Sequence, residues 1–140
     1  MAERLQLGPN SLGLSFIYNV SGRVGFKQPN APDDVQLVQF FLREEMKTRA
    51  DLIPLGIPTL SGKFDAVTGF YLYLWQNKAN RSVVDGIVSP AHGVQYGAAA
   101  SSVWLIVDLN NVLKTINPTG FEKLHTNPDL RASLRAAIAP

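Results

Sequence analysis

The fold is decided by two short segments, Leu60-Ser61-Gly62-Lys63-Phe64-Asp65-Ala66-Val67-Thr68 and Val83-Val84-Asp85-Gly86-Ile87-Val88. Each segment places a pair of turn residues beside an apolar residue that can anchor the turn in a core. The stretch between them, residues 69–80, predicts a helix that is held at both ends by ordered loops. A helix fixed in this way has a defined exposed face, which is typical of a binding module and requires no catalysis.

Asp65 is the predicted N-cap of this central helix, and Thr68 occupies its third position. Tyr73 and Gln76 are expected nearer the rim. The aromatic side chains of the helix could stack on sugar rings, but aromatic residues at helical spacing more often form core. Tyr73 is therefore the better candidate for an exposed contact. The residues that share helical spacing predict this buried stripe: Val67, Phe70, Tyr71, Leu74, Trp75 and Ala79.

A preceding helix is predicted from its start signal, Asn30-Ala31-Pro32-Asp33-Asp34, which combines a capping side chain, an early proline and acidic residues in the first turn. It should end near Arg49. Its apolar stripe comprises Val35, Val38, Phe41, Leu42 and Met46, whereas Gln36, Arg43, Glu44 and Lys47 lie off that stripe. Within the otherwise irregular first 30 residues, residues 14–20 read as a short strand.

The C-terminal part of the chain predicts further helices. Residues 102–114 fit a helix or a strand, and helical spacing favours the helix. In the last helix Asn127 should be the cap, Pro128 the first residue, and Leu130, Leu134 and Ile138 the buried stripe. Ser89-Pro90 is expected to begin a short helical turn. These elements together predict a mainly α fold in a single domain, residues 1–140.

The composition of the chain argues against several classes of protein. Its 140 residues suit one domain, and 13 Lys and Arg against 11 Asp and Glu leave a net charge of +2. Basic residues alternate with acidic ones, as in residues 43–47, so no nucleic-acid partner is expected. The chain contains no cysteine and hence no disulfide or thiolate site. The N-terminus has no apolar signal core, and the run 98–107 is too short for a membrane span.

Catalytic and metal-binding patterns are weak throughout. His92 and His125 stand outside zinc-binding spacing; a site that joins Asp85 to His92 is conceivable, but surface histidines explain them better. Residues 22–27 lack the spacing of a phosphate-binding loop. Carboxylates such as Glu45 lack an apolar flank that would raise their pKa into the range of a general acid. We therefore expect no enzyme, no cofactor and no metal.

Four motifs in order resemble the peptidoglycan-binding domain family: residues 35–42, residues 60–68, Trp75-Gln76, and residues 84–90. In that family a V-x-x-x-Q-x-x-L helix precedes D-G-x-F-G-x-x-T, a second helix ending in F-Q, and a closing D-G-x-x-G-x-x-T. This chain differs at several positions, with Ser61 in place of Asp, Asp65 in place of the second Gly, Trp75 in place of Phe and Ser89 in place of the last Gly. Residues 20–25 and 30–35 resemble a version of the domain found near phage-tail and type VI secretion proteins.

The resemblance implies a small three-helix core at residues 33–93, preceded by an irregular N-terminal segment and followed by a helical extension at residues 94–140. It implies non-covalent binding of peptidoglycan in a groove between the central helix and its flanking loops. The polar residues best placed to line it are Asp65, Thr68, Tyr73, Gln76 and Asp85. Helix capping explains Asp65 and Thr68 at least as well, and a turn explains Asp85.

Three functions follow, in descending order. The first is a non-catalytic wall-binding module of a phage-tail-like or type VI secretion apparatus. The second is an adaptor or structural subunit that binds another protein of such an assembly, and the third is a small wall hydrolase. In each case we expect synthesis in the cytoplasm without a signal peptide, and delivery to the periplasm or wall by that apparatus.

Overall fold

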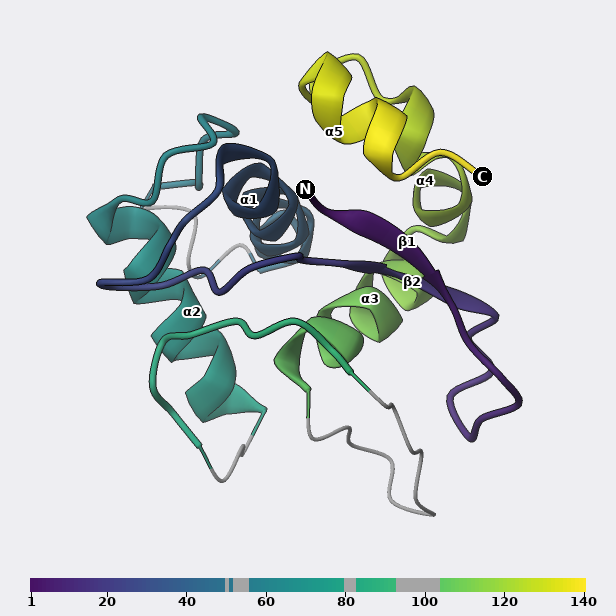
Figure 1. Ribbon diagram of the computed structural model, residues 1–140. Coiled ribbons are helices and arrows are strands. Elements are labelled where there is room, and N and C mark those ends of the chain that lie inside the picture. The colour runs from purple at the N-terminus through teal and green to yellow at the C-terminus, as the bar shows by residue number, and fades with distance from the viewer. Residues whose placement is uncertain (50, 52–55, 80–82, 93–103) are drawn as a thin grey trace.

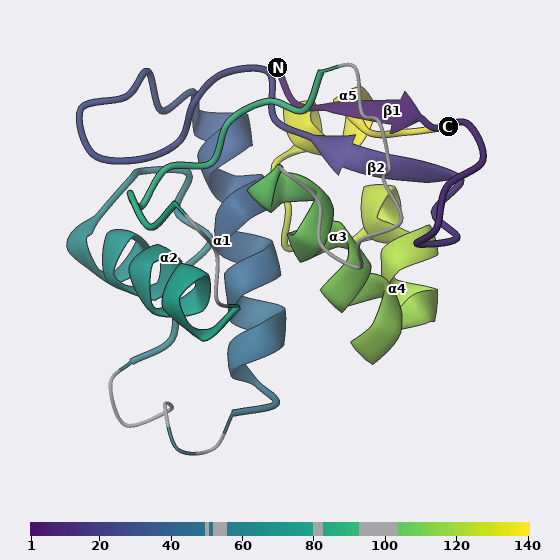
Figure 2. The same ribbon diagram turned by 90° about the horizontal axis from the view of Figure 1, so that it is seen from below.

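The computed structural model describes residues 1–49, 51, 56–79, 83–92 and 104–140. Their fold is mainly α, as the sequence predicts, with a two-stranded sheet near the N-terminus (Figure 1). The helix α1 (Pro32–Met46) runs through the middle of the molecule, with α2 (Ala66–Lys78) on one side and α3 (Leu105–Ile116) on the other (Figure 2). None of the helices in these described ranges is long and apolar enough to cross a membrane.

A hairpin forms the N-terminal part of the fold. Strand β2 (Phe16–Asn19) confirms the strand predicted within residues 14–20, and β1 (Glu3–Gln6) pairs with it antiparallel, which the sequence did not predict. The intervening loop is fixed by Asn10, whose amide oxygen accepts hydrogen bonds from the backbone N–H groups of Leu12 and Leu14. All four residues of β2 are buried, because β1 lies on its edge and α3 packs against it.

The helix α1 is buried on nearly all sides, since α2, α3 and α5 all pack against it. Its residues 33–42 are all buried, so the prediction that Gln36 faces solvent is wrong. Gln36 is 3% exposed; its amide nitrogen donates to Leu60 O at 2.7 Å, and its oxygen accepts from Arg131 N at 2.7 Å. The predicted capping residue Asn30 is not the N-cap either, because Ala31 takes that position.

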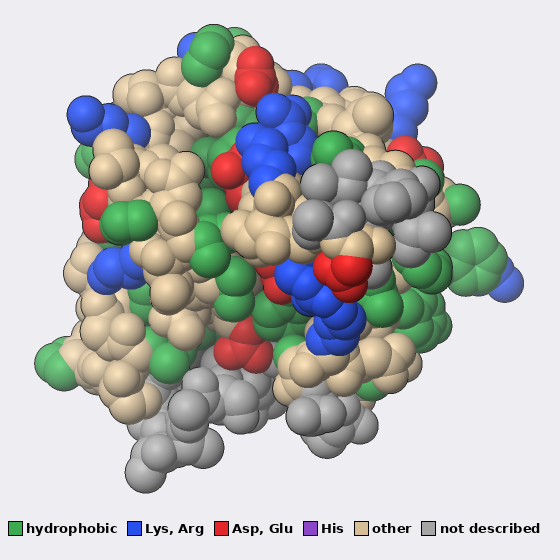
Figure 3. Space-filling model, turned by 180° about the vertical axis from the view of Figure 1, so that it is seen from behind, with side chains coloured by type: hydrophobic (Ala, Val, Ile, Leu, Met, Phe, Trp, Pro, Cys, Tyr) green, Lys and Arg blue, Asp and Glu red, His purple; other side chains and the backbone are tan. Residues whose placement is uncertain are grey.

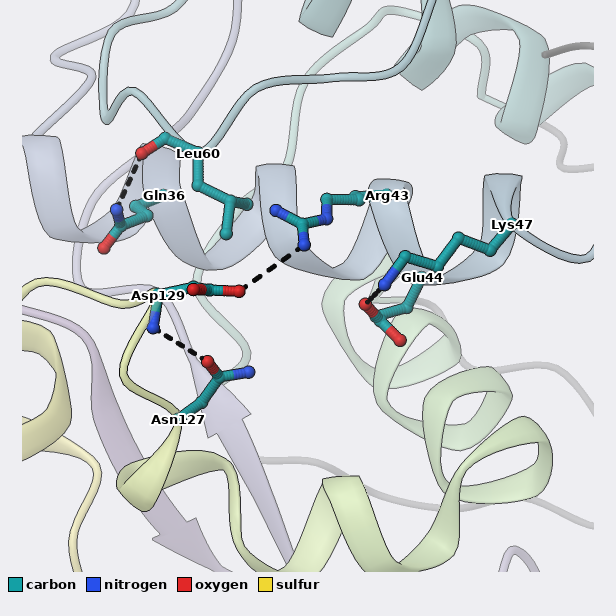
Figure 4. Close-up of polar contacts among 7 residues, drawn as sticks. All are labelled: Gln36, Arg43, Glu44, Lys47, Leu60, Asn127 and Asp129. Carbon is teal, nitrogen blue, oxygen red and sulfur yellow. Dashed lines mark hydrogen bonds and ion pairs between the residues drawn. The ribbon is translucent and has the colours of Figure 1, made fainter.

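The exposed edge of α1 carries two ion pairs, which Figure 4 shows with the Gln36–Leu60 hydrogen bond. Arg43 lies 3.5 Å from the carboxylate of Asp129, and Lys47 lies 2.6 Å from that of Glu44. Exposed pairs of this kind contribute about 0–1 kcal/mol each. The Arg43–Asp129 pair therefore fixes the position of the C-terminal segment more than it stabilises the fold.

The helix α2 begins where the sequence predicts, with Asp65 as its N-cap. Its buried face differs from the predicted stripe: Val67 and Phe70 are 39% and 49% exposed, Ala79 is exposed, and Leu74 and Trp75 are partly buried. The buried residues are Thr68, Tyr71, Leu72 and Gln76. Two of these four are polar because they hydrogen-bond to the neighbouring turns, and those bonds set the rotation of the helix.

The helix α3 confirms the helical interpretation of this segment, although residues 102 and 103 lie outside the described residues. Its Asn110 is fully buried and joins α3 to β2, accepting from Tyr18 N at 2.7 Å and donating to Tyr18 O at 2.9 Å. The Tyr18 hydroxyl donates to Phe121 O at 2.6 Å. Burial raises the pKa of Tyr18 to about 12, so this hydroxyl remains a donor.

The C-terminal segment comprises α4 (Pro118–Glu122), the short 3₁₀ helix η2 (Leu124–Thr126) and α5 (Ala132–Ala137). The prediction that Asn127 caps the last helix is wrong. Its amide oxygen accepts from Asp129 N in a turn, and α5 begins only after Arg131 has bonded to Gln36. The predicted buried residues Leu130, Leu134 and Ile138 are confirmed, and they join the same core as the hairpin, α1 and α3.

Candidate functional site

The turn before α2 is held by Gln39, a fully buried side chain of α1. Its oxygen accepts from Gly62 N at 2.9 Å, and its nitrogen donates to Lys63 O at 3.0 Å and to Thr68 Oγ1 at 3.1 Å. Gly62 has a φ of +71°, a conformation that glycine adopts without strain. One helix thereby fixes both the turn and the first residues of the next helix.

The turn after α2 is held in the same way by Gln76, which is 2% exposed. Its oxygen accepts from Gly86 N at 2.8 Å, and its nitrogen donates to Asp85 Oδ1 at 3.1 Å. Gly86 has a φ of +69°, and a Cβ atom placed on it would lie 2.6 Å from the ring of Tyr73. The expectation that Gln76 lies near the rim is therefore wrong, because the turn covers it.

A third turn of similar sequence, Ser21-Gly22-Arg23-Val24, is held by the buried carboxylate of Asp34 on α1. That carboxylate accepts from Ser21 N at 3.0 Å and from Gly22 N at 2.9 Å. Beyond the turn, Val24 exchanges two backbone hydrogen bonds with Val88, of 3.0 and 2.9 Å. The first and third turns thus lie side by side next to α2, as Figures 1 and 2 both show for residues 20–30 and 83–92.

These three turns share the pattern Ser or Asp, Gly, any residue, and an apolar residue, at positions 21–24, 61–64 and 85–88. Each is held by a buried polar side chain of a helix. Sequence reasoning identified the segments singly and missed the repetition, although the recurring pattern was visible in the sequence. The repetition indicates that this pattern serves to build a rigid frame around α2.

The predicted site residues lie together around α2, but most of their polar atoms serve the fold. Asp65 Oδ1 accepts from the backbone N–H and the hydroxyl of Thr68, at 2.8 and 2.6 Å, and Thr68 is fully buried. Asp85 Oδ1 accepts from Ile87 N at 2.9 Å as well as from Gln76. Tyr73 differs from these four because its ring is 48% exposed.

Tyr73 belongs to a surface that we call the aromatic face, formed by Phe26, Val67, Phe70 and Tyr73. Their exposed fractions are 72%, 39%, 49% and 48%. The last three follow one another at three-residue steps along α2, so they share one side of the helix. Phe26 comes from the loop after Val24, which lies beside the turn that contacts Tyr73. Its exposure depends on that tertiary arrangement, and no sequence signal identified it.

The loop that carries Phe26 is closed by Asn30. The Asn30 amide oxygen accepts from Gly25 N at 2.9 Å, and its nitrogen donates to Gly25 O and Gln28 O at 2.8 and 2.9 Å. Asn30 and Lys27 both adopt positive φ, of 52° and 57°, which is uncommon for residues other than glycine. This ring of bonds holds the exposed phenylalanine in a defined loop.

The chemistry of the described residues suits binding. They contain no group of three His, Cys, Asp or Glu side chains that could hold a metal. Figure 3 shows the rear face, where Lys and Arg side chains lie among Asp and Glu side chains and hydrophobic groups reach the surface between them. One carboxyl departs from the sequence expectation: burial raises the pKa of Glu45 to about 7, against a smaller opposing effect of Arg49.

Comparison with known proteins supplies no template for this site. No family model matches the chain, and neither a curated protein nor a solved structure matches it.

Proposed function

We propose that this chain is a non-catalytic peptidoglycan-binding module that contacts the glycan through its aromatic face. The observation that supports the proposal is the set of exposed rings, Phe26, Phe70 and Tyr73, carried by a helix and a loop that hydrogen-bonded turns hold in place. Aromatic faces pack against the apolar faces of sugar rings. A surface that is ordered before binding loses less conformational entropy on binding.

The polar residues of the motifs support this choice of surface indirectly. Asp65, Thr68, Gln76 and Asp85 make hydrogen bonds within the frame, so contacts with a ligand fall to the side chains that project from it. In this proposal the three turns orient the rings and the rings supply the affinity. Delivery to the wall by a phage-tail-like or secretion apparatus is part of the same proposal.

The test is co-sedimentation of the full chain with purified insoluble peptidoglycan. We expect retention of the wild type, and about fivefold to tenfold weaker retention of Tyr73→Ala and Phe26→Ala, the loss that about 1 kcal/mol per aromatic contact produces. Ile116→Ala is the matched control, because Ile116 is 39% exposed at the end of α3, outside the aromatic face. Circular dichroism checks that each variant is folded.

Two results would refute the proposal. Absence of the wild type from the pellet excludes wall binding and favours the alternative, a protein-interaction adaptor that uses the same exposed rings. Equal retention of the wild type and both aromatic variants would exclude the aromatic face as the contact. Zymography on the same wall material tests the hydrolase alternative, where a cleared zone would show catalysis.

A further inference from the structure

A narrow pocket lies between the C-terminal half of α1 and the side of α2 that faces it. It encloses about 250 Å³ of empty space, including its open mouth. Its α2 side comes from residues 71, 74, 75 and 78, whereas the aromatic face uses residues 67, 70 and 73 of that helix. The pocket is therefore a separate feature, with this lining: Leu42, Glu45, Met46, Arg49, Tyr71, Leu74, Trp75 and Lys78.

Two polar atoms of this lining are buried and make no hydrogen bond within the described part of the chain: Glu45 Oε2 and Trp75 Nε1. An unpaired buried polar group costs about 1–3 kcal/mol. Such groups are uncommon in folded proteins and call for an explanation. Here one is an oxygen and the other an N–H donor, and both belong to one pocket with apolar walls.

The charge of the pocket restricts its occupant further. Arg49 and Lys78 contribute positive charge to the lining, and Arg49 also pairs with Asp51 at 3.4 Å. Burial raises the pKa of Glu45 to about 7, so its carboxyl is an acceptor when ionised and also a donor when protonated. An anionic ligand would meet the ionised carboxylate, and a cation would leave the Trp75 N–H unpaired. A hydrocarbon would leave both atoms unpaired.

We propose that this pocket binds an amide group, whose carbonyl oxygen accepts from Trp75 Nε1 and whose N–H donates to Glu45 Oε2. An amide is neutral and offers an acceptor and a donor on adjacent atoms. Its aliphatic substituent would contact Leu42, Met46 and Leu74. The narrow pocket suits a head group of a few atoms, so a whole sugar ring would remain outside.

Two sources supply this chemistry: the acetamido group of an amino sugar, and the backbone amide of a short peptide of small residues. The inference concerns a different side of α2 from the aromatic face. It therefore holds or fails independently of wall binding through that face.

The experiment is an NMR titration of the ¹⁵N-labelled full chain with N-methylacetamide, which carries the amide without either source. We expect a saturable shift of the Trp75 indole N–H resonance, while the resonance of Trp104 stays in place. Trp75→Phe and Trp104→Phe assign the two indole signals. N-acetylglucosamine and N-acetylalanine methylamide then distinguish the sources, and glucose, which lacks an amide, is the negative control.

Two variants test the hydrogen bonds through backbone resonances near the pocket. Trp75→Phe removes the donor and keeps an aromatic ring, and we expect about fivefold weaker binding of N-methylacetamide. Glu45→Ala removes the acceptor, with a loss of similar size expected, whereas Ile116→Ala should bind as the wild type does. The proposal is overturned by no saturable shift at Trp75, by equal shifts with glucose, or by unchanged affinity in both pocket variants.

Discussion

Replacing Gln39 by Ala should be among the most damaging single substitutions in this fold. The side chain makes three of its hydrogen bonds to the turn before α2, with Gly62 N, Lys63 O and Ser61 Oγ, and a fourth to Thr68 Oγ1. Its loss leaves the buried N–H of Gly62 unpaired, at a cost of about 1–3 kcal/mol. The space vacated by the side chain adds about 1–2 kcal/mol.

The expected total is about 3–4 kcal/mol, a large part of the 5–15 kcal/mol by which domains are usually stable. Urea unfolding followed by far-UV circular dichroism measures this loss, and the thermal midpoint should fall by about 10 °C. Gln6→Ala is the matched control: Gln6 is exposed on β1, and its replacement should change stability by less than about 0.5 kcal/mol. A loss below about 1 kcal/mol for Gln39→Ala would refute the reasoning that this side chain holds the turn.

Three further predictions concern stability. Because the pKa of Glu45 is raised from 4.5 to about 7, its contribution to stability is greatest below pH 4.5 and is lost as the pH rises through 7. The shift corresponds to about 3 kcal/mol, which partial solvent exposure reduces to about 1–2 kcal/mol. Glu45→Gln should therefore gain that stability over the wild type at pH 8 and little at pH 4.5; urea unfolding at both values measures it, and an equal difference at the two would contradict it. Gly86→Ala should cost about 1–3 kcal/mol, because φ is +69° and the new Cβ would meet the Tyr73 ring at 2.6 Å; an unchanged thermal midpoint would argue against this geometry. Asn110→Leu should cost about 2–4 kcal/mol, since it leaves the buried N–H and C=O of Tyr18 without these bonds; a neutral result in chemical unfolding would show that Asn110 does not join α3 to β2.

The positions of the helices follow from local signals in the sequence, whereas their buried faces do not. Pro32 with two acidic residues, and Asp65 with Thr68, mark the starts of α1 and α2 because capping depends on residues within one turn. The rotation of α2 depends on Gln76 and on a turn nine residues beyond it. Apolar spacing alone therefore placed Phe70 inside and Gln76 outside, the reverse of the structure.

The same limit applies to strand β1 and to the last helix. A short polar segment such as β1 becomes a strand by pairing with β2, across a loop that periodicity does not describe. Asn127 carries a local capping signal, but the bond from Arg131 N to Gln36, 95 residues away, delays the start of α5. Long-range hydrogen bonds to α1 thus decide where the elements around it begin and how they face.

The candidate site shows why motif residues predict a fold more securely than a ligand. Asp85 Oδ1 accepts from Ile87 N and from Gln76 Nε2, and at the equivalent position Ser61 Oγ accepts from Lys63 N and from Gln39 Nε2. Serine therefore replaces aspartate in the same structural role. The residues that carry the resemblance to peptidoglycan-binding domains are those that hold the turns.

This equivalence separates the role of the frame from the role of the exposed rings. Ser61→Asp should keep the turn, change stability by less than about 1 kcal/mol and leave retention on peptidoglycan unchanged. Phe26→Ala should also leave stability nearly unchanged, because the ring is 72% exposed, yet weaken retention. Urea unfolding and co-sedimentation of both variants measure the two effects separately. Stronger retention of Ser61→Asp, together with normal retention of Phe26→Ala, would mean that the turns contact the wall and the rings do not.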